Sequence, residues 1–151
     1  MSVDPALSDL ERTLHREMPI SVAMGMRAVG WVDRRLAMEM PLAPNRNHQD
    51  SAFAGSLNAL CTVVGWGTVY LLVREAGLAG NVVIRRASIR YLRPVRSAVI
   101  QAQGLTLDPE GEAFFFELLQ SKGRSKIDVG AQIVDADGPL VTFTGSYVVQ
   151  D

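Results

Sequence analysis

A polar loop between Asn47 and Asp50 holds the side chains best suited to chemistry. Asp50 is the only carboxylate between Glu39 and Glu75, so it is the one local candidate for a general base that activates water. It could instead cap the helix that follows. The amide of Asn47 can orient water or a carbonyl, or it can stabilise a turn. His48 can titrate near neutral pH, although a lone histidine in a loop is more often exposed and without a role.

A second set of chemical groups lies at the start of the apolar stretch that follows the loop. A helix that begins there leaves its first N–H groups unsatisfied and carries a partial positive charge at that end. Gly55 leaves room for a substrate carbonyl to reach these groups, and the amides near Gly55 and Ser56 can stabilise an oxyanion. Alternatively, Gly55 only lets the helix pack on a strand. Ser56 lacks the Gly-x-Ser-x-Gly surroundings of a serine nucleophile, so we expect its hydroxyl to bind substrate or a helix carbonyl.

The apolar stretch carries no charge from Ser51 to Val73, a run of 23 residues. Such a run is long enough to cross a membrane. However, it contains serine, threonine, asparagine and three glycines, and it lacks an aromatic belt and a basic flank. We therefore predict a helix over residues 52–76 that is apolar on every face and buried inside a soluble domain. Glycines such as Gly65 and Gly67 favour a helix that a neighbouring backbone approaches closely.

Most of the remaining chain shows the alternation typical of strands. We predict strands over residues 24–32, 35–41, 82–92, 98–107, 113–121, 125–134 and 140–149, and a short amphipathic helix over residues 7–17. The segments 113–121 and 125–134 are expected to form a hairpin through Lys122-Gly123-Arg124. The apolar face of such a sheet must be covered, and the long helix is the only candidate. The sequence thus predicts one α+β domain over residues 1–151, an antiparallel sheet of about five to seven strands wrapped round one central helix in the hotdog arrangement.

The overall composition excludes several classes of function. Lysine and arginine number 15 and aspartate and glutamate 16, which gives a net charge of −1 and rules out a general electrostatic grip on nucleic acid. The single cysteine, Cys61, excludes an intramolecular disulfide and any multi-cysteine metal site, and we expect no metal. We expect Cys61 to act as a small hydrophobe. Residues 1–14 show no secretion signal, so we expect a cytoplasmic protein that binds no membrane.

Residue order and spacing around the helix start resemble a known family. Asn47, followed six positions later by Phe53-Ala54-Gly55-Ser56-Leu57 and then by a helix with Gly65-Trp66, is similar to the hotdog-fold thioesterases of the YiiD C-terminal type. The segment from Ile89 to Val95 resembles the strand ending after the helix in these and many acyl-CoA thioesterases. The similarity covers about residues 18–150. It implies hydrolysis of acyl-CoA or acyl-carrier-protein thioesters by direct attack of water, with CoA or phosphopantetheine present only as part of the substrate and no other cofactor.

This sequence departs from the wider thioesterase pattern, which has Asn, then His-Gly-Gly, then a helical carboxylate nine residues after that His. Phe53 and Ala54 replace the His and the first Gly, and Thr62 stands where the carboxylate is expected. Any general base must then come from the loop. The alternative is a binding or interaction module that kept the fold, binds acyl-CoA or an acyl carrier, and lost the base.

The candidate site residues follow from the loop, the helix start and the resemblance. The expected catalytic residues are Asn47, Asp50, Gly55 and Ser56. The expected substrate-binding residues are His48, Phe53, Asn58, Thr62, Arg90 and Arg93. The polar Asn58 and Thr62 on the apolar helix face either an acyl tunnel or a hydrogen-bond partner inside the core.

Five arginines form a basic run beyond the long helix: Arg85, Arg86, Arg90, Arg93 and Arg96. A carrier such as CoA has phosphates that arginine binds in a bidentate manner, whereas a solvated face or ion pairs between subunits would account for the run equally well. Strand alternation puts Arg86 and Arg90 on one face and Arg85 and Arg93 on the other, unless a bulge intervenes. Arg90 and Arg93 are the best candidates for carrier binding because they are nearest the exposed end of the strand.

The resemblance also implies an assembly. Hotdog proteins of this kind form dimers in which two central helices lie side by side and the sheets join, and an exposed strand edge invites such pairing. We therefore expect a homodimer, or a dimer of dimers, whose pocket combines residues 47–56 of one chain with the helix or strand of its partner.

Overall fold

The computed structural model of the protein describes residues 4–150. In chain order its elements are α1 (Pro5–Glu17), α2 (Ile20–Met24), β1 (Arg27–Val32), β2 (Arg35–Pro41), the short 3-10 helix η1 (Ala43–Asn45), α3 (Ala54–Glu75), β3 (Asn81–Tyr91), β4 (Val99–Gly104), α4 (Pro109–Lys122), β5 (Arg124–Asp135) and β6 (Gly138–Gln150).

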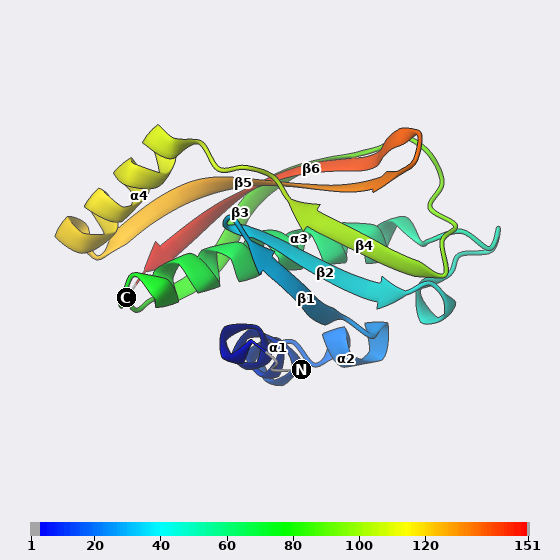
Figure 1. Cartoon of the computed structure of the whole chain (residues 1–151), viewed down its shortest axis with the longest axis horizontal. Helices are drawn as coiled ribbons and strands as arrows, with labels where there is room; N and C mark the ends of the chain where they lie inside the picture. The colour runs from blue at the N-terminus through cyan, green and yellow to red at the C-terminus, as the bar shows by residue number, and fades with distance from the viewer. Residues whose placement is uncertain (1–3, 151) are drawn as a thin grey trace.

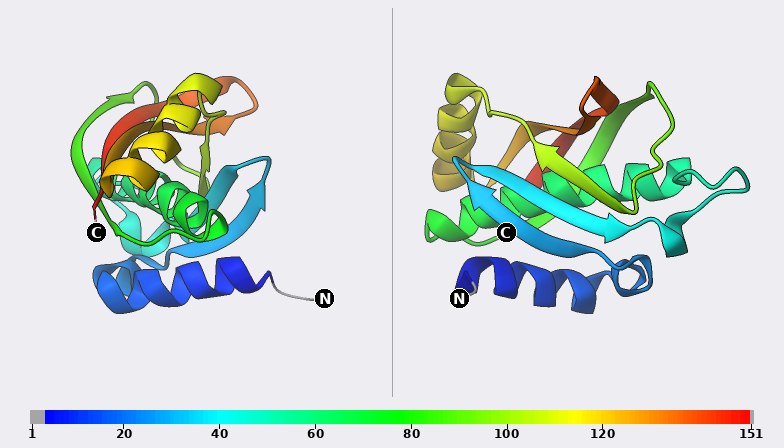
Figure 2. Two further views of the ribbon diagram at one scale, coloured as in Figure 1. Left: turned by 90° about the vertical axis from the view of Figure 1, so that its left-hand side faces the viewer. Right: turned by 45° about the vertical axis from the view of Figure 1, so that its right-hand side comes forward.

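Six strands form one antiparallel sheet in the order β1-β2-β4-β5-β6-β3. The sheet curls around α3, which contacts every strand from β2 to β6 along the inner face (Figures 1 and 2). Strand residues alternate accordingly: in β5, Ile127 and Val129 are buried, whereas Lys126 and Asp128 are exposed. The predicted hotdog fold, an α+β sheet around one long central helix, is confirmed.

Most of α3 is buried because its apolar residues occupy every face. The helix is long and apolar enough to cross a membrane, but 72% of its most apolar window is buried inside the fold, as in the core helix of a soluble protein. Gly65 and Gly67 permit this packing, since a Cβ at Gly65 would overlap the Tyr147 phenol and one at Gly67 would lie 2.5 Å from Leu36 Cδ2. The close neighbours are therefore side chains, and not the backbone that the sequence led us to expect.

The N-terminal segment packs beside α3 and β1 (Figure 2). The predicted amphipathic helix is confirmed as α1, whose Leu10 and Leu14 are fully buried. The predicted strand start at Met24 is wrong, because α2 ends there and Gly25 follows with a positive φ of 76°. This left-handed turn delays the strand to Arg27.

The predicted strand over residues 113–121 is wrong, and so is the hairpin expected at residues 122–124, because this segment is α4. Capping decides the outcome: the Asp108 carboxylate accepts a 3.1 Å hydrogen bond from the N–H of Gly111, and Gly123 ends the helix with a φ of 71°. Phe115 and Leu119, four residues apart, are buried against the inner face near the end of α3. The sheet is thus covered by more than the one helix that we expected.

The strand β3 lies at an edge of the sheet and, within residues 4–150, pairs only with β6. Its register with β6 skips between Ile84 and Arg86, so Arg85 is the extra residue of a β-bulge. Beside the bulge, Val83 and Ile84 are 55% and 38% exposed. The edge therefore combines free backbone groups with apolar side chains.

Candidate functional site

The buried side chain of Asn45 anchors the segment that leads into α3. Its Nδ2 donates hydrogen bonds of 2.8 Å to the carbonyls of Met24 and Pro41. Its own carbonyl accepts a 2.7 Å bond from the N–H of Phe53, the residue before the helix. Sequence reasoning missed Asn45 because a Pro-Asn pair is an ordinary loop signal, and only the folded chain buries it.

Asn47 organises the loop between this anchor and the helix. Its Oδ1 accepts hydrogen bonds from the N–H groups of Gln49 at 2.8 Å and Ser51 at 3.2 Å, and its Nδ2 donates to Ser51 Oγ at 2.9 Å. Arg46 and Ala52 pair in an isolated antiparallel bridge at the base. The amide of Asn47 is therefore engaged in holding a small loop that protrudes beside the start of α3 (Figure 1).

His48 and Asp50 are exposed within this loop. The Asp50 side chain is 83% exposed, and its carboxylate lies 3.8 Å from a guanidinium nitrogen of Arg46. Asp50 has a positive φ of 59°, a left-handed conformation that Asp and Asn adopt more readily than most residues. The one carboxylate of the loop is therefore accessible to solvent.

Among the residues that the structure describes, no side chain caps the N-terminus of α3. Phe53, the residue before it, makes no side-chain capping bond, and the first turn contains no acid. The N–H groups of Ala54, Gly55 and Ser56 have no hydrogen-bond acceptor within residues 4–150, whereas that of Leu57 donates to the Phe53 carbonyl. Three backbone donors and the positive end of a 22-residue helix are thus presented together.

The ring of Phe53 lies against Gly55. A Cβ at Gly55 would be 2.5 Å from Phe53 Cε2, and Phe53 is 56% exposed. Because this ring is a surface side chain, it can change rotamer without disturbing the core. Ser56 is buried one residue further on. Phe53, Gly55 and Ser56 thus lie together at the start of α3.

Tyr91 joins the start of α3 from the neighbouring strand. Its Oη donates a 3.1 Å hydrogen bond to the carbonyl of Ala54. Burial raises the pKa of Tyr91, so the phenol keeps its proton at neutral pH and remains a donor. Sequence reasoning missed this residue, because the contact joins positions 37 residues apart and no local pattern reveals it.

A partly exposed ridge of residues spaced by four runs along α3, and its members are Ala54, Asn58, Thr62, Trp66, Tyr70 and Arg74. The side chains of Asn58 and Thr62 make no hydrogen bond within the described residues. Trp66 stacks on Tyr70 with ring centroids 5.4 Å apart. Cys61, by contrast, is fully buried, and burial raises its pKa to about 12. It is therefore a protonated thiol in the core rather than a nucleophile.

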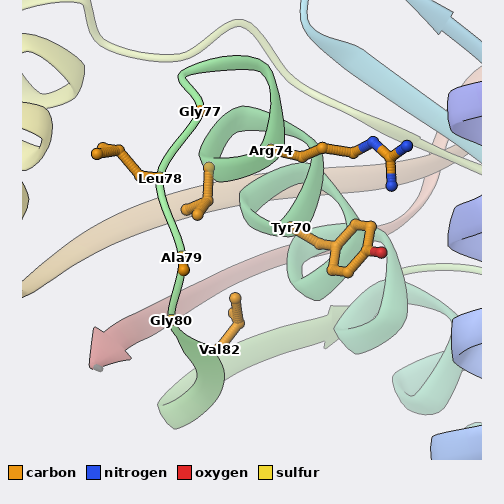
Figure 3. A pocket seen from close by; sticks show the side chains of 8 residues that line it. Tyr70, Arg74, Gly77, Leu78, Ala79, Gly80 and Val82 are labelled. Atoms are coloured by element: carbon orange, nitrogen blue, oxygen red, sulfur yellow. The ribbon is translucent and has the colours of Figure 1, made fainter.

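The ridge ends at a cavity of about 400 Å³ beside the C-terminus of α3 (Figure 3). Tyr70 Oη donates a 2.6 Å hydrogen bond to Asp9 of α1, and Arg74 forms an ion pair with the same carboxylate. Val73 and Val82 line the cavity with apolar side chains. The cavity thus lies at the opposite end of α3 from the uncapped amides.

The predicted carrier-binding arginines differ in their contacts. Arg93 donates to both carboxylate oxygens of Asp135, at 2.9 and 3.1 Å, and to the Gly138 carbonyl at 3.1 Å. This hydrogen bonding by Arg93 lowers the pKa of Asp135. Arg90 is exposed and makes no ion pair within residues 4–150. Arg90 is therefore better placed than Arg93 to meet a phosphate.

Comparison with known proteins identifies the family. A model described as "Putative thioesterase (yiiD_Cterm)" matches residues 7–151. The chain belongs to this family. Within residues 4–150, this YiiD_C protein has no group of three His, Cys, Asp or Glu side chains placed to hold a metal ion.

Solved structures are similar to this chain over nearly its full length. A protein of unknown function from Chlorobaculum tepidum TLS is 30% identical, with 95% of this chain and 93% of that chain covered and a TM-score of 0.89. A "putative thioesterase" from Shewanella oneidensis is 29% identical over 99% of this chain and 100% of that chain, with a TM-score of 0.84. A thioesterase from Haemophilus influenzae shares the fold at 14% identity, with 100% and 93% covered and a TM-score of 0.74.

Proposed function

We propose that this protein hydrolyses acyl-CoA or acyl-carrier-protein thioesters, and that the uncapped start of α3 binds the thioester carbonyl. The observation that carries the proposal is the set of free N–H groups at residues 54–56. Attack on the carbonyl creates an oxyanion, which accepts hydrogen bonds from these fixed donors. CoA or phosphopantetheine enters only as part of the substrate. A cytoplasmic location fits the buried free thiol of Cys61.

A water molecule is the proposed nucleophile, and Asp50 is the proposed general base. Asp50 accepts the proton of the attacking water as the tetrahedral oxyanion forms. When the carbon–sulfur bond breaks, the same proton passes to the departing sulfur, which leaves a carboxylic acid and a free thiol. Asn47 supports this step by holding the loop that carries Asp50 through its bonds to Gln49 and Ser51.

The proposed active unit is a homodimer formed through β3 and the ridge on α3. Its support is an 11-residue strand whose outer edge pairs with no other strand of the described chain and which exposes Val83 and Ile84. A two-fold axis that sets two α3 helices antiparallel would bring the uncapped end of one towards the cavity at the other end of its partner. Light scattering at micromolar concentration should give twice the 16.4 kDa of one chain; a monomer would overturn the shared site.

Thiol release from a panel of acyl-CoAs of increasing chain length tests the proposed activity. We expect turnover by the wild type and a loss of about 100-fold or more in kcat for Asp50→Asn. Asparagine tolerates positive φ, so this substitution removes the charge without straining the backbone. Asp33→Asn is the matched control, because Asp33 is also exposed and has a φ of 54°.

The outcomes distinguish the proposed hydrolase activity from the proposed role of Asp50 as its general base. Failure to hydrolyse any acyl-CoA or acyl-carrier thioester would overturn the proposed activity. Turnover that Asp50→Asn leaves unchanged would instead overturn only the role of Asp50. We expect Asp33→Asn to match the wild type in either case.

A non-catalytic acyl-carrier binding module is the second candidate, and two observations favour it. The ridge on α3 carries Thr62 where related enzymes keep a carboxylate, and Asp50 is 83% exposed rather than held against the helix. This candidate predicts saturable binding of acyl-CoA with no thiol release. It also predicts that Asp50→Asn leaves the binding affinity unchanged.

A further inference from the structure

The outer face of the sheet carries a basic pocket away from the start of α3. The long helices pack on the inner side, so the outer face of β3, β6 and β5 is open in the part of the chain that the structure describes (Figure 2). A cavity of about 230 Å³ on this face is lined by Arg85, Arg86, Lys126 and Ser146. Three of its four lining residues are cations.

The bulge in β3 explains how two consecutive arginines reach one cavity. Regular alternation would send Arg85 and Arg86 to opposite faces of the sheet. The register skip beside Ile84 removes that alternation, so both line the pocket. Ser146 stands opposite Arg86 in the β3–β6 ladder and opposite Asp128 in the β5–β6 ladder, so it lines the pocket with a cation on one side and a carboxylate on the other.

None of the three cations forms an ion pair within residues 4–150. Elsewhere, arginines such as Arg34, Arg74 and Arg93 each meet a carboxylate. Like charges held together repel one another, and a bound anion would offset that repulsion. Arginine and lysine with a hydroxyl are the groups that bind phosphate.

A second depression of about 220 Å³ continues from the first, because both are lined by Arg86 and Ser146. It adds Ser88, Thr144 and the carboxylate of Asp128. Hydroxyls and a carboxylate suit the hydroxyls of a sugar or the amino group of a base. The two depressions together therefore match a ligand with phosphates at one end and a neutral polar group at the other.

We propose that this outer-face pocket binds the nucleotide portion of a CoA thioester, with its diphosphate at Arg85, Arg86 and Lys126 and its nucleoside towards Asp128. This inference rests on the proposed function and names the carrier as a nucleotide rather than a protein. Arg86 and Arg90 share the outer face of β3 and are separated by about 13 Å of extended strand. Tyr91, the next residue, bonds Ala54 at the start of α3. The strand thus links the pocket to the uncapped amides.

Calorimetric titration of the full chain with ADP, pyrophosphate and adenosine tests the pocket without any thioester. We expect ADP to bind, and Arg86→Gln with Lys126→Gln to weaken ADP binding about tenfold or more. The matched control is Arg16→Gln with Lys122→Gln, which removes the same charges from exposed helical positions and should change the affinity less than about twofold. Asp128→Asn should reduce the preference for ADP over pyrophosphate, because it weakens the nucleoside contact and removes one negative charge.

Several results would overturn the pocket. The first is that ADP does not bind to the wild type, and the second is that the control pair weakens ADP binding as much as the pocket substitutions do. The third is that an acyl carrier protein binds, that the Arg86 and Lys126 substitutions abolish this binding, and that ADP does not bind. Acyl-CoA turnover with an unchanged KM in the Arg86→Gln and Lys126→Gln variant would overturn the pocket but leave the proposed hydrolase. ADP binding that the variant weakens, in a chain that hydrolyses no thioester, would support the pocket and overturn the proposed hydrolase.

Discussion

Two glycines, Gly65 and Gly55, allow the middle of α3 to be compared with its start. Gly65 lies in the core, where a Cβ would overlap the Tyr147 phenol, and Tyr147 Oη donates a 2.7 Å bond to the Thr62 carbonyl. Gly55 lies at the exposed start, where the atoms nearest to an added Cβ belong to the surface ring of Phe53. The same residue type thus serves close packing at one place and an open approach to backbone donors at the other.

The difference shows where stability and function separate along one helix. In the middle, burial and interlocking side chains fix the position of α3. At the start, capping that would stabilise the helix is absent. An uncapped end next to a tightly packed core is what a binding site on a rigid element requires.

The largest expected contrast between these regions is thiol reactivity. Burial raises the pKa of Cys61 to about 12, so its thiolate fraction at neutral pH is about three orders of magnitude below that of a free thiol. We expect Cys61 to react with a chromogenic disulfide only when the chain unfolds. Phe53→Cys in a Cys61→Ala background should react at once. Rapid labelling of Cys61 in the folded wild type would contradict the packed middle.

The next largest effect should be a difference in stability between substitutions of the two glycines. We expect Gly65→Ala to lower the free energy of unfolding by about 1–3 kcal/mol, because the methyl group forces the Tyr147 ring to shift. Gly55→Ala should cause no loss, since alanine is the better helix former and the Phe53 ring can move. Urea denaturation followed by circular dichroism measures the stability of both variants. Equal losses of stability would contradict the difference between the middle of α3 and its start.

The Gly55 substitution, which we expect to leave stability intact, should instead reduce activity. Gly55→Ala is expected to lower kcat/KM for an acyl-CoA about tenfold, because a methyl group beside the amides keeps the carbonyl away from them. Arg16→Gln, far from the site on α1, provides a control that should retain full activity. If Gly55→Ala hydrolyses thioesters as well as the wild type, the carbonyl does not bind at these amides.

Sequence patterns revealed the long helix and failed at its contacts. The uncharged run predicted α3 because a buried helix needs no charge on any face. The pattern failed at residues 113–121, where three phenylalanines favour a strand but the Asp108 and Gly123 caps produce a helix. The Tyr91–Ala54 bond and the bulge at Arg85 depend on the folded sheet, so neither could be predicted locally.

The smallest expected effect concerns the C-terminal end of α3, which side-chain contacts hold in place, in contrast to its uncapped start. The Tyr70 hydroxyl, then Arg74, lower the pKa of Asp9 below its usual value, so the charged form is stabilised in the folded state. This contribution is fully present above the unfolded pKa, about 3.9, and is lost as the pH falls through the lower folded pKa. Because Asp9 is partly exposed, we expect Asp9→Asn to cost less than about 1 kcal/mol at neutral pH.

Urea denaturation from pH 7 to pH 2 measures how this difference changes. The gap between wild type and Asp9→Asn should stay constant down to about pH 5 and then close in stronger acid. Asp33→Asn, at a turn where Asp33 makes no ion pair within the described residues, should show a smaller gap throughout. A gap that stays unchanged down to pH 2 would mean that Asp9 holds α3 through packing rather than charge, and the far end of the helix would then be fixed in the same way as its middle.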